Sequence, residues 1–171
     1  MNDGGPATRE LTQQERATNA ETWKHINRVQ QLMLGLASEL IARAARHDQS
    51  KLVLPEVEGF AKHTESLRGM TYKSPEYEAA MKDMAATIEH HYANNSHHPQ
   101  HFPNGVNGMD ILDLVEMLCD WRAAGERHAD GSMDKSLEIN GPRFDIAPQL
   151  IEVFRNSAKR WATASRPGGA T

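Results

Sequence analysis

The sequence predicts an all-α protein, a compact single-domain helical bundle of about six helices. Apolar residues recur three and four positions apart in several blocks, and almost no stretch alternates apolar and polar residues as a half-buried strand does. A chain of 171 residues also falls within the usual size of one domain. We therefore expect one helical domain over residues 12–163, with flexible ends at residues 1–11 and 164–171.

Four helices are expected in the first half of the chain. Two of them, over residues 12–34 and 36–48, can be continuous through Gly35. The first carries an apolar stripe that is expected to face inward and consists of Trp23, Ile26, Val29 and Met33. A third over residues 56–67 and a fourth over residues 74–92 each begin beside a proline, which is tolerated in the first turn of a helix.

Two further helices, separated by loops, are expected in the second half of the chain. Residues 94–107, rich in Asn, His and Pro, are expected to form a loop. Asp110, or Asn107 just upstream, can cap a helix that ends near His128. A turn follows at Asp130, and the last helix covers residues 146–161. That helix has an apolar stripe for which core packing is the preferred interpretation and a homodimer contact the alternative: Leu150, Val153, Phe154 and Trp161.

Composition excludes several classes of protein. The formal net charge of -4 gives no basic field that would attract a nucleic acid duplex. The single cysteine, Cys119, allows no disulfide within the chain and no thiolate zinc site, which fits a reducing compartment. No apolar run approaches the roughly 20 residues of a membrane span. We expect a cytoplasmic protein, in the host cytoplasm if a phage encodes it, with neither a membrane nor duplex nucleic acid as partner.

The strongest chemical signal is the stretch His47-Asp48-Gln49-Ser50-Lys51. An adjacent imidazole and carboxylate can bind the same ion, and the two carboxylate oxygens can bridge two ions. Lys51 follows Asp48 by three residues, where an ammonium group can hold a phosphate oxygen. An HD dipeptide alone is more typical of a surface helix end, so its interpretation depends on the rest of the chain.

Histidines crowd one later stretch of the sequence. Four candidate ligands fall within nine residues: His90, His91, His97 and His98. Neutral imidazoles bind divalent transition metals such as Mn, Fe, Co, Ni and Zn. Adjacent helical residues point about 100° apart, so only one of the first pair is expected to face an ion. His63 and His101 fit a fortuitous histidine-rich surface better.

Acidic residues line one face of the helix that follows Asp110. Asp113, Glu116 and Asp120 are spaced by three and four residues and project together. A partly buried row of acids repels itself unless cations compensate it. A solvated face is the preferred interpretation for Asp113, whereas Asp120 is the better ligand. Far upstream, His25 lies mid-helix among apolar positions, where an imidazole needs a metal or a hydrogen-bond partner.

These candidates follow the order H…HD…H…D, which resembles the HD-domain superfamily of helical metalloenzymes. The HDxxK stretch is similar to the HDxGK of HD-GYP phosphodiesterases and of myo-inositol oxygenase, although Ser50 replaces the glycine and no GYP motif follows. Closer still, residues 25–121 resemble an uncharacterised family of small phage and bacterial proteins with HDxSK, NxHHP and ExxxDW motifs. That second resemblance implies no substrate.

The superfamily resemblance implies a first metal ion held by His25, His47, Asp48 and Asp120. Asp48 would bridge to a second ion held by His91 or His90 together with His97 or His98. Lys51 would contact the substrate's phosphate. Glu56 and Glu116 have no equivalent in the superfamily pattern, but both are expected near the site, where either can act as a base or orient the ligands. Arg28 and Arg46 can reach a second phosphate, although both are more typical of surface charges. The number of ions is left open.

The leading interpretation is a metal-dependent phosphohydrolase in which Asp48, Lys51 and Glu116 act in catalysis and Lys51 and Arg28 bind substrate. The substrate would be a nucleotide or a similar small phosphorylated metabolite, and one or two divalent transition metal ions would be the cofactor. Two alternatives remain open: an HD-type diiron oxygenase and a non-catalytic phage protein that binds a host component.

Overall fold

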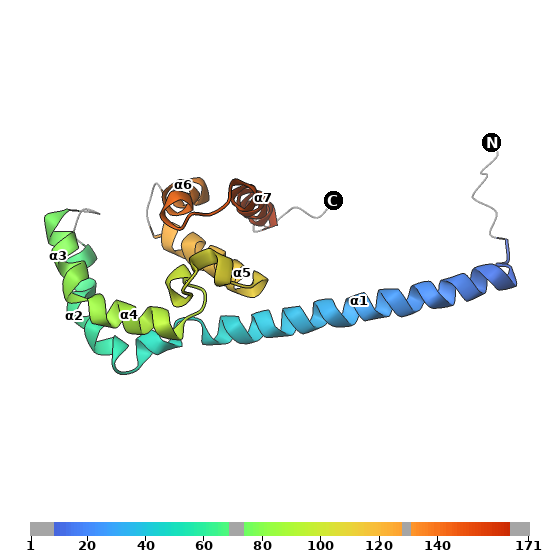
Figure 1. Ribbon diagram of the computed structural model, residues 1–171, viewed down its shortest axis with the longest axis horizontal. Helices are drawn as coiled ribbons and strands as arrows, with labels where there is room; N and C mark the ends of the chain where they lie inside the picture. The colour runs from blue at the N-terminus through green and yellow to red at the C-terminus, as the bar shows by residue number, and fades with distance from the viewer. Residues whose placement is uncertain (1–8, 69–73, 128–130, 165–171) are drawn as a thin grey trace. The chain divides into compact units, whose positions relative to one another are not determined.

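The computed structural model describes residues 9–68, 74–127 and 131–164 (Figure 1). All regular elements in these residues are helical, seven α-helices and three short 3-10 helices, so the expected all-α class is confirmed. None of the helices in this part of the chain combines the length and hydropathy of a membrane span. The expected flexible ends fall largely outside the described residues.

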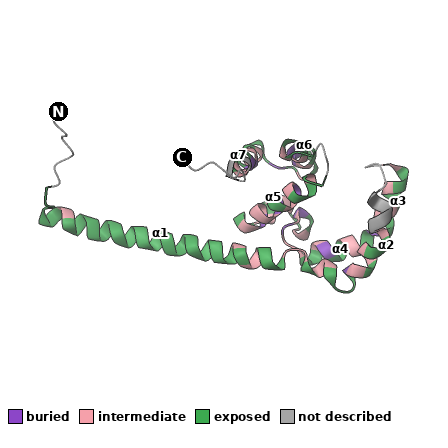
Figure 2. Cartoon of the chain, turned by 180° about the vertical axis from the view of Figure 1, so that it is seen from behind, coloured by how far each residue is buried: buried purple, intermediate pink, exposed green. Residues whose placement is uncertain are grey.

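The chain separates into two units, residues 1–42 and residues 43–171. The first contains most of helix α1, Gln13–Arg46, which joins the two expected helices because Gly35 does not interrupt it. Exposed residues, drawn in green, run along most of this helix in Figure 2. The first unit offers α1 no second described helix to pack against, so the expected inward face of its apolar stripe stays a prediction, as does the single domain.

The second unit begins with the end of α1, then η1 (Gln49–Leu52) and α2 (Glu56–Arg68). The helix expected over residues 74–92 is divided at Met84 into α3 (Pro75–Asp83) and α4 (Ala85–Asn94). Ser74 caps α3 as expected, its hydroxyl accepting a hydrogen bond from the Tyr77 amide at 3.2 Å. Helix α2 contacts η1, α3 and α4, so the start of α2 and the end of α4 lie close to the HD stretch.

The histidine-rich loop is more regular than expected, since it contains η2 (Pro99–His101) and η3 (Gly105–Gly108). Helix α5, Ile111–Gly125, follows and is capped by Asp110 as expected. The Asp110 carboxylate accepts hydrogen bonds from the amides of Leu112 and Asp113, and the Asp113 carboxylate accepts one from the Asp110 amide at 3.0 Å. This reciprocal capping box fixes where α5 starts and which way its acidic side chains point.

The last two helices are α6 (Met133–Arg143) and α7 (Pro148–Ala164). Helix α6 was not expected, because the glycine and proline near its end obscure the helical pattern. The apolar core joins three helices and consists of Met117, Leu118, Trp121, Leu137, Ile146 and Phe154. Phe154 is buried and Leu150 and Trp161 pack against this core, so core packing of the α7 stripe is confirmed, although Val153 is exposed. One side of α5 is thereby anchored while its acidic face is left for other contacts.

Replacing Leu137 with alanine is expected to lower the free energy of unfolding by about 2–5 kcal/mol, because this side chain is only 2% exposed and its loss leaves a cavity. Ile139→Ala on the same helix is the matched control, since Ile139 is 53% exposed and its loss should change stability by less than about 0.5 kcal/mol. Urea denaturation followed by circular dichroism measures both. Equal losses in the two variants would contradict this placement of α6.

Candidate metal centre

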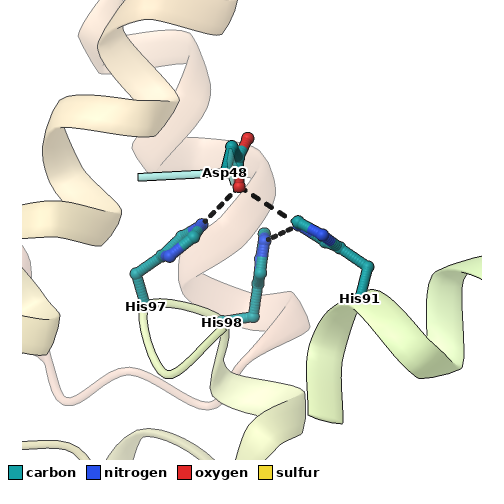
Figure 3. A group of neighbouring side chains, drawn as sticks. All are labelled: Asp48, His91, His97 and His98. Atoms are coloured by element: carbon teal, nitrogen blue, oxygen red, sulfur yellow. Dashed lines mark hydrogen bonds and ion pairs between the residues drawn. The ribbon is translucent and has the colours of Figure 1, made fainter. Parts of the chain in front are cut away.

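Asp48 lies at the middle of a cluster of histidines (Figure 3). It follows the last turn of α1 in the left-handed conformation, with φ of 56°, which aspartate tolerates better than most residues. Its Oδ1 lies 3.3 Å from Nε2 of His91 and 3.5 Å from Nε2 of His97. Its Oδ2 lies 2.6 Å from Nζ of Lys51 and 3.5 Å from Nε2 of His47. The two oxygens of one carboxylate therefore face different partners.

Glu56 orients the histidines that come from α4. Its side chain is fully buried, and its two oxygens accept hydrogen bonds from Nδ1 of His90 and Nδ1 of His91, each at 2.8 Å. The Ser50 hydroxyl donates a third hydrogen bond to Glu56 at 2.9 Å. A histidine whose Nδ1 is held by a carboxylate presents Nε2 as its ligand atom. For His91 that atom lies 3.3 Å from Oδ1 of Asp48 and 2.9 Å from Nε2 of His98, as Figure 3 shows.

Glu116 orients two further histidines around Asp48, His47 and His97. Its Oε1 lies 2.9 Å from Nδ1 of His47 and 3.2 Å from Nδ1 of His97. Arg43 donates to its Oε2 at 3.2 Å. The Nε2 atoms of both imidazoles are left facing Asp48, so Glu56 and Glu116 together aim three nitrogen atoms at one carboxylate.

Two buried atoms at this point, Oδ1 of Asp48 and Nε2 of His97, form no hydrogen bond within the described structure. A buried polar atom left unpaired costs about 1–3 kcal/mol. A cation between the two atoms would satisfy both, since each offers it a lone pair. The donor set therefore fits a metal ion on the chemistry of its own residues.

Three groups of residues bring their ligand atoms within 4.8 Å of one another. The first, in Figure 3, consists of Asp48, His91, His97 and His98. The second consists of His47, Asp48 and Asp120, and the third of His47, His97 and Glu116. Asp48 belongs to the first two groups, so its two oxygens can serve two neighbouring positions. In the second group, Nε2 of His47 lies 3.9 Å from Oδ1 of Asp120.

Lowered pKa values keep three of these donors, His97, His98 and Asp48, unprotonated near neutral pH. Burial, together with the neighbouring His97 and His91, lowers the pKa of His98 to about 3. Burial also lowers the pKa of His97, despite the opposing effect of Glu116. Burial alone raises the pKa of Asp48, but the nearby His91 and Lys51 outweigh it and the net pKa is lowered. Neutral imidazoles and an ionised carboxylate are the forms that bind metal ions.

The structure brings together most residues that the sequence singled out, namely His47, Asp48, Lys51, His91, His97, His98, Glu116 and Asp120. It distinguishes the two adjacent histidines, because His91 is buried beside Asp48 whereas His90 is exposed and contributes only its contact with Glu56. His97 and His98 both enter the first group, where one of them was expected. His63 pairs with Asp83 and His101 with the Tyr92 carbonyl, outside all three groups.

His25 and Arg28 lie on α1 in the first unit, where both are exposed. The two units are described separately, so the roles given to these residues stay predictions. The three groups above do not include them.

The buried ion pair between Arg43 and Asp113 was missed by the sequence interpretation. Asp113, expected on a solvated face, is 4% exposed, so that expectation is wrong. Its Oδ1 accepts hydrogen bonds from Arg43 at 2.7 Å and from Ser96 at 2.6 Å. Two spacings in the sequence could have indicated this pair. Asp113 follows its capping partner Asp110 by three residues, and Arg43 lies one helical turn before His47. These contacts tie the segment before His97 to α5.

Comparison with known proteins gives one family. The model of the Family of unknown function (DUF5662) matches residues 14–160, a range that includes the whole candidate centre. No curated protein and no solved structure matches the chain significantly.

Replacing Asp113 with alanine is expected to destabilise the metal-free protein by about 3 kcal/mol or more, because the change leaves Arg43 partly buried without its closest partner. Burial alone raises the pKa of Asp113, but Ser96, the Asp110 amide and Arg43 lower it to a net value below the ordinary 3.8. Its contribution is therefore complete above pH 3.8 and is lost as the pH falls through the lowered value. The difference in free energy of unfolding between wild type and Asp113→Ala should therefore become smaller as the pH falls below 3.8.

Asp120→Ala is the matched control on the same helix, since Asp120 makes no hydrogen bond to a described residue and should change metal-free stability by less than about 0.5 kcal/mol. Chemical denaturation in EDTA, at pH 7 and at pH 3, measures all three proteins. The structural role of Asp113 would be contradicted if the stability difference between wild type and Asp113→Ala did not change with pH. It would also be contradicted if Asp120→Ala lost as much stability as Asp113→Ala.

Proposed function

Since the chain belongs to the DUF5662 family, whose description assigns no activity, we propose a function from the geometry of the site: a metal-dependent phosphohydrolase centred on Asp48. The substrate is a small phosphorylated metabolite, with nucleotides included. The observation that carries the proposal is the shared Asp48 carboxylate, which has two imidazole nitrogens near Oδ1 and an ammonium and an imidazole near Oδ2.

The donor set favours a borderline divalent metal such as Mn, Fe, Co, Ni or Zn, because it combines imidazole nitrogens with carboxylate oxygens and has no thiolate. His91, His97, His98 and Asp48 would hold the first ion. His47, Asp120 and the second oxygen of Asp48 would hold another. When bound, such ions supply a hydroxide near neutral pH and neutralise charge on phosphoryl oxygens.

Lys51 supplies a positive charge next to the centre. Its Nζ lies 2.6 Å from Oδ2 of Asp48 and 5.4 Å from the centroid of the Phe60 ring. A phosphoryl group bound at the metal centre beside Asp48 would come within reach of this ammonium, which can donate to a phosphate oxygen as a flexible point charge. This placement supports the substrate-binding role that the sequence predicts for Lys51.

Glu116 takes a different role from the one that the sequence interpretation preferred. Its oxygens already receive hydrogen bonds from two imidazoles and a guanidinium, which leaves little capacity for accepting a proton from water. In the proposal it orients His47 and His97. Asp120, which is partly exposed and not hydrogen-bonded to a described side chain, is the acid free to bind a metal or accept a proton.

The proposal predicts that purified protein binds one or two divalent ions per chain and that manganese, cobalt or nickel supports phosphate release from a panel of nucleotides and phosphorylated metabolites. His91→Ala should weaken metal binding by at least about tenfold and reduce turnover accordingly, because it removes a buried ligand. His63→Ala is the matched control, since His63 pairs with Asp83 outside the three groups. Elemental analysis, calorimetry and phosphate release measure these effects.

Two results would contradict the proposal. Metal-loaded protein that releases no phosphate from any substrate but consumes oxygen with two bound irons would favour the oxygenase. Unchanged melting in EDTA, with no metal by elemental analysis, would favour a binding protein without a catalytic centre.

A further inference from the structure

A cavity of about 200 Å³ adjoins the candidate metal centre. Two of its lining residues, His98 and Asp120, belong to the groups around Asp48. Its other polar lining residues are Tyr92, Gln100, Asn140 and Arg143. The larger hollows beside α6 and α7 contain none of the candidate ligands in their described linings. A molecule bound in this cavity can therefore reach both the centre and the end of α6.

Arg143 gives the cavity an available positive charge. Its guanidinium lies 4.8 Å from the centroid of the Phe144 ring, and no described carboxylate comes within ion-pair distance of it. Arg43, by contrast, pairs with three carboxylates, and Arg155 pairs with two. An arginine that stacks on an aromatic ring keeps its in-plane N–H groups free for a planar or tetrahedral anion.

The neighbours of Arg143 extend this anion-binding character. Asn140 lies three residues earlier on α6, and Gln100 reaches the cavity from η2. Their amide groups can donate further hydrogen bonds. The Phe144 ring stacks on Trp121 of the core, with ring planes 13° apart and centroids 6.0 Å apart, which holds the platform under the guanidinium. The cavity thus combines fixed apolar surface with a few convergent polar groups, as small-molecule sites do.

We infer that this cavity is the substrate pocket and that Arg143 anchors a second anionic group of the substrate, a phosphate or a carboxylate. The inference rests on the proposed function, because the first anionic group of the substrate is the phosphoryl group that is hydrolysed at the metal centre around Asp48. The small volume limits the part of the substrate between the two anionic groups to a few atoms. The substrate class is therefore a phosphorylated metabolite with two nearby negative groups, such as a nucleoside diphosphate or a short phosphocarboxylate.

Three phosphonates that cannot be hydrolysed test the inference by calorimetry on the manganese-loaded protein. Methylphosphonate carries one anionic group, phosphonoacetate adds a carboxylate, and methylenediphosphonate adds a second phosphonate. The wild type should bind at least one of the two-headed compounds ten times or more tightly than methylphosphonate. Whichever is bound more tightly identifies the second group as carboxylate or phosphate.

Arg143→Gln should lose this preference while it keeps the affinity for methylphosphonate, which also reports that the variant is folded. Arg127→Gln is the matched control, since Arg127 is exposed near the end of α5 and does not line the cavity. Equal preference in wild type and Arg143→Gln would overturn the inference, even if methylphosphonate binding still required metal.

Failure of the proposed function gives a different result. If the protein binds no metal, the same titrations on the metal-free protein decide the matter. Binding of a two-headed phosphonate that Arg143→Gln abolishes would still support the pocket, and binding that does not depend on Arg143 would overturn it.

Discussion

Hydrogen bonds from Nδ1 atoms to two glutamates determine which way four histidine rings face. Glu56 holds His90 and His91, and Glu116 holds His47 and His97. Three of these rings then present Nε2 to Asp48. Without these carboxylates the imidazole rings would be free to rotate. Nε2 of His97 would then not be held facing Oδ1 of Asp48, the other buried atom without a hydrogen bond.

This arrangement is costly to fold without a ligand. Placing Glu56 at zero exposure removes a charge from water, and three hydrogen bonds offset that cost only because their donors are fixed nearby. Oδ1 of Asp48 has no such compensation among the described atoms. Polar groups held in a dense, partly unsatisfied cluster contribute little to stability, which is why their presence indicates a functional centre.

Helix α5 connects this centre to the rest of the second unit. Its apolar side contributes Met117, Leu118 and Trp121 to the core, while the adjoining side carries Asp113, Glu116 and Asp120. The three acids differ in their partners: Asp113 binds Arg43 and Ser96, and Glu116 binds Arg43 and two imidazoles. Asp120 faces both the centre and the cavity. A single amphipathic helix thereby fixes the distance between the core, the histidines and the pocket.

Much of the centre was predictable because the relevant signals are local. Asp48, Lys51 and Asp120 were found from the spacing of charged residues, and Asp110 from its position before an apolar run. The choice of His91 over His90 was not predictable, since it depends on how α4 is rotated against Glu56. Helix α6 and the role proposed for Arg143 were missed for a similar reason: Gly141 and Pro142 hide the helical pattern, and the cavity forms only when α6 packs beside α5.

Anomalous X-ray diffraction from a crystal grown with manganese or iron can show whether Asp48 shares a metal ion with the buried histidines. We expect an anomalous peak within bonding distance, about 2.0–2.3 Å, of Oδ1 of Asp48 and of at least two Nε2 atoms among His91, His97 and His98. A peak at Oδ2 of Asp48 and Asp120 would add the second ion. No peak at Asp48, or metal bound only at surface histidines such as His63, would contradict the account.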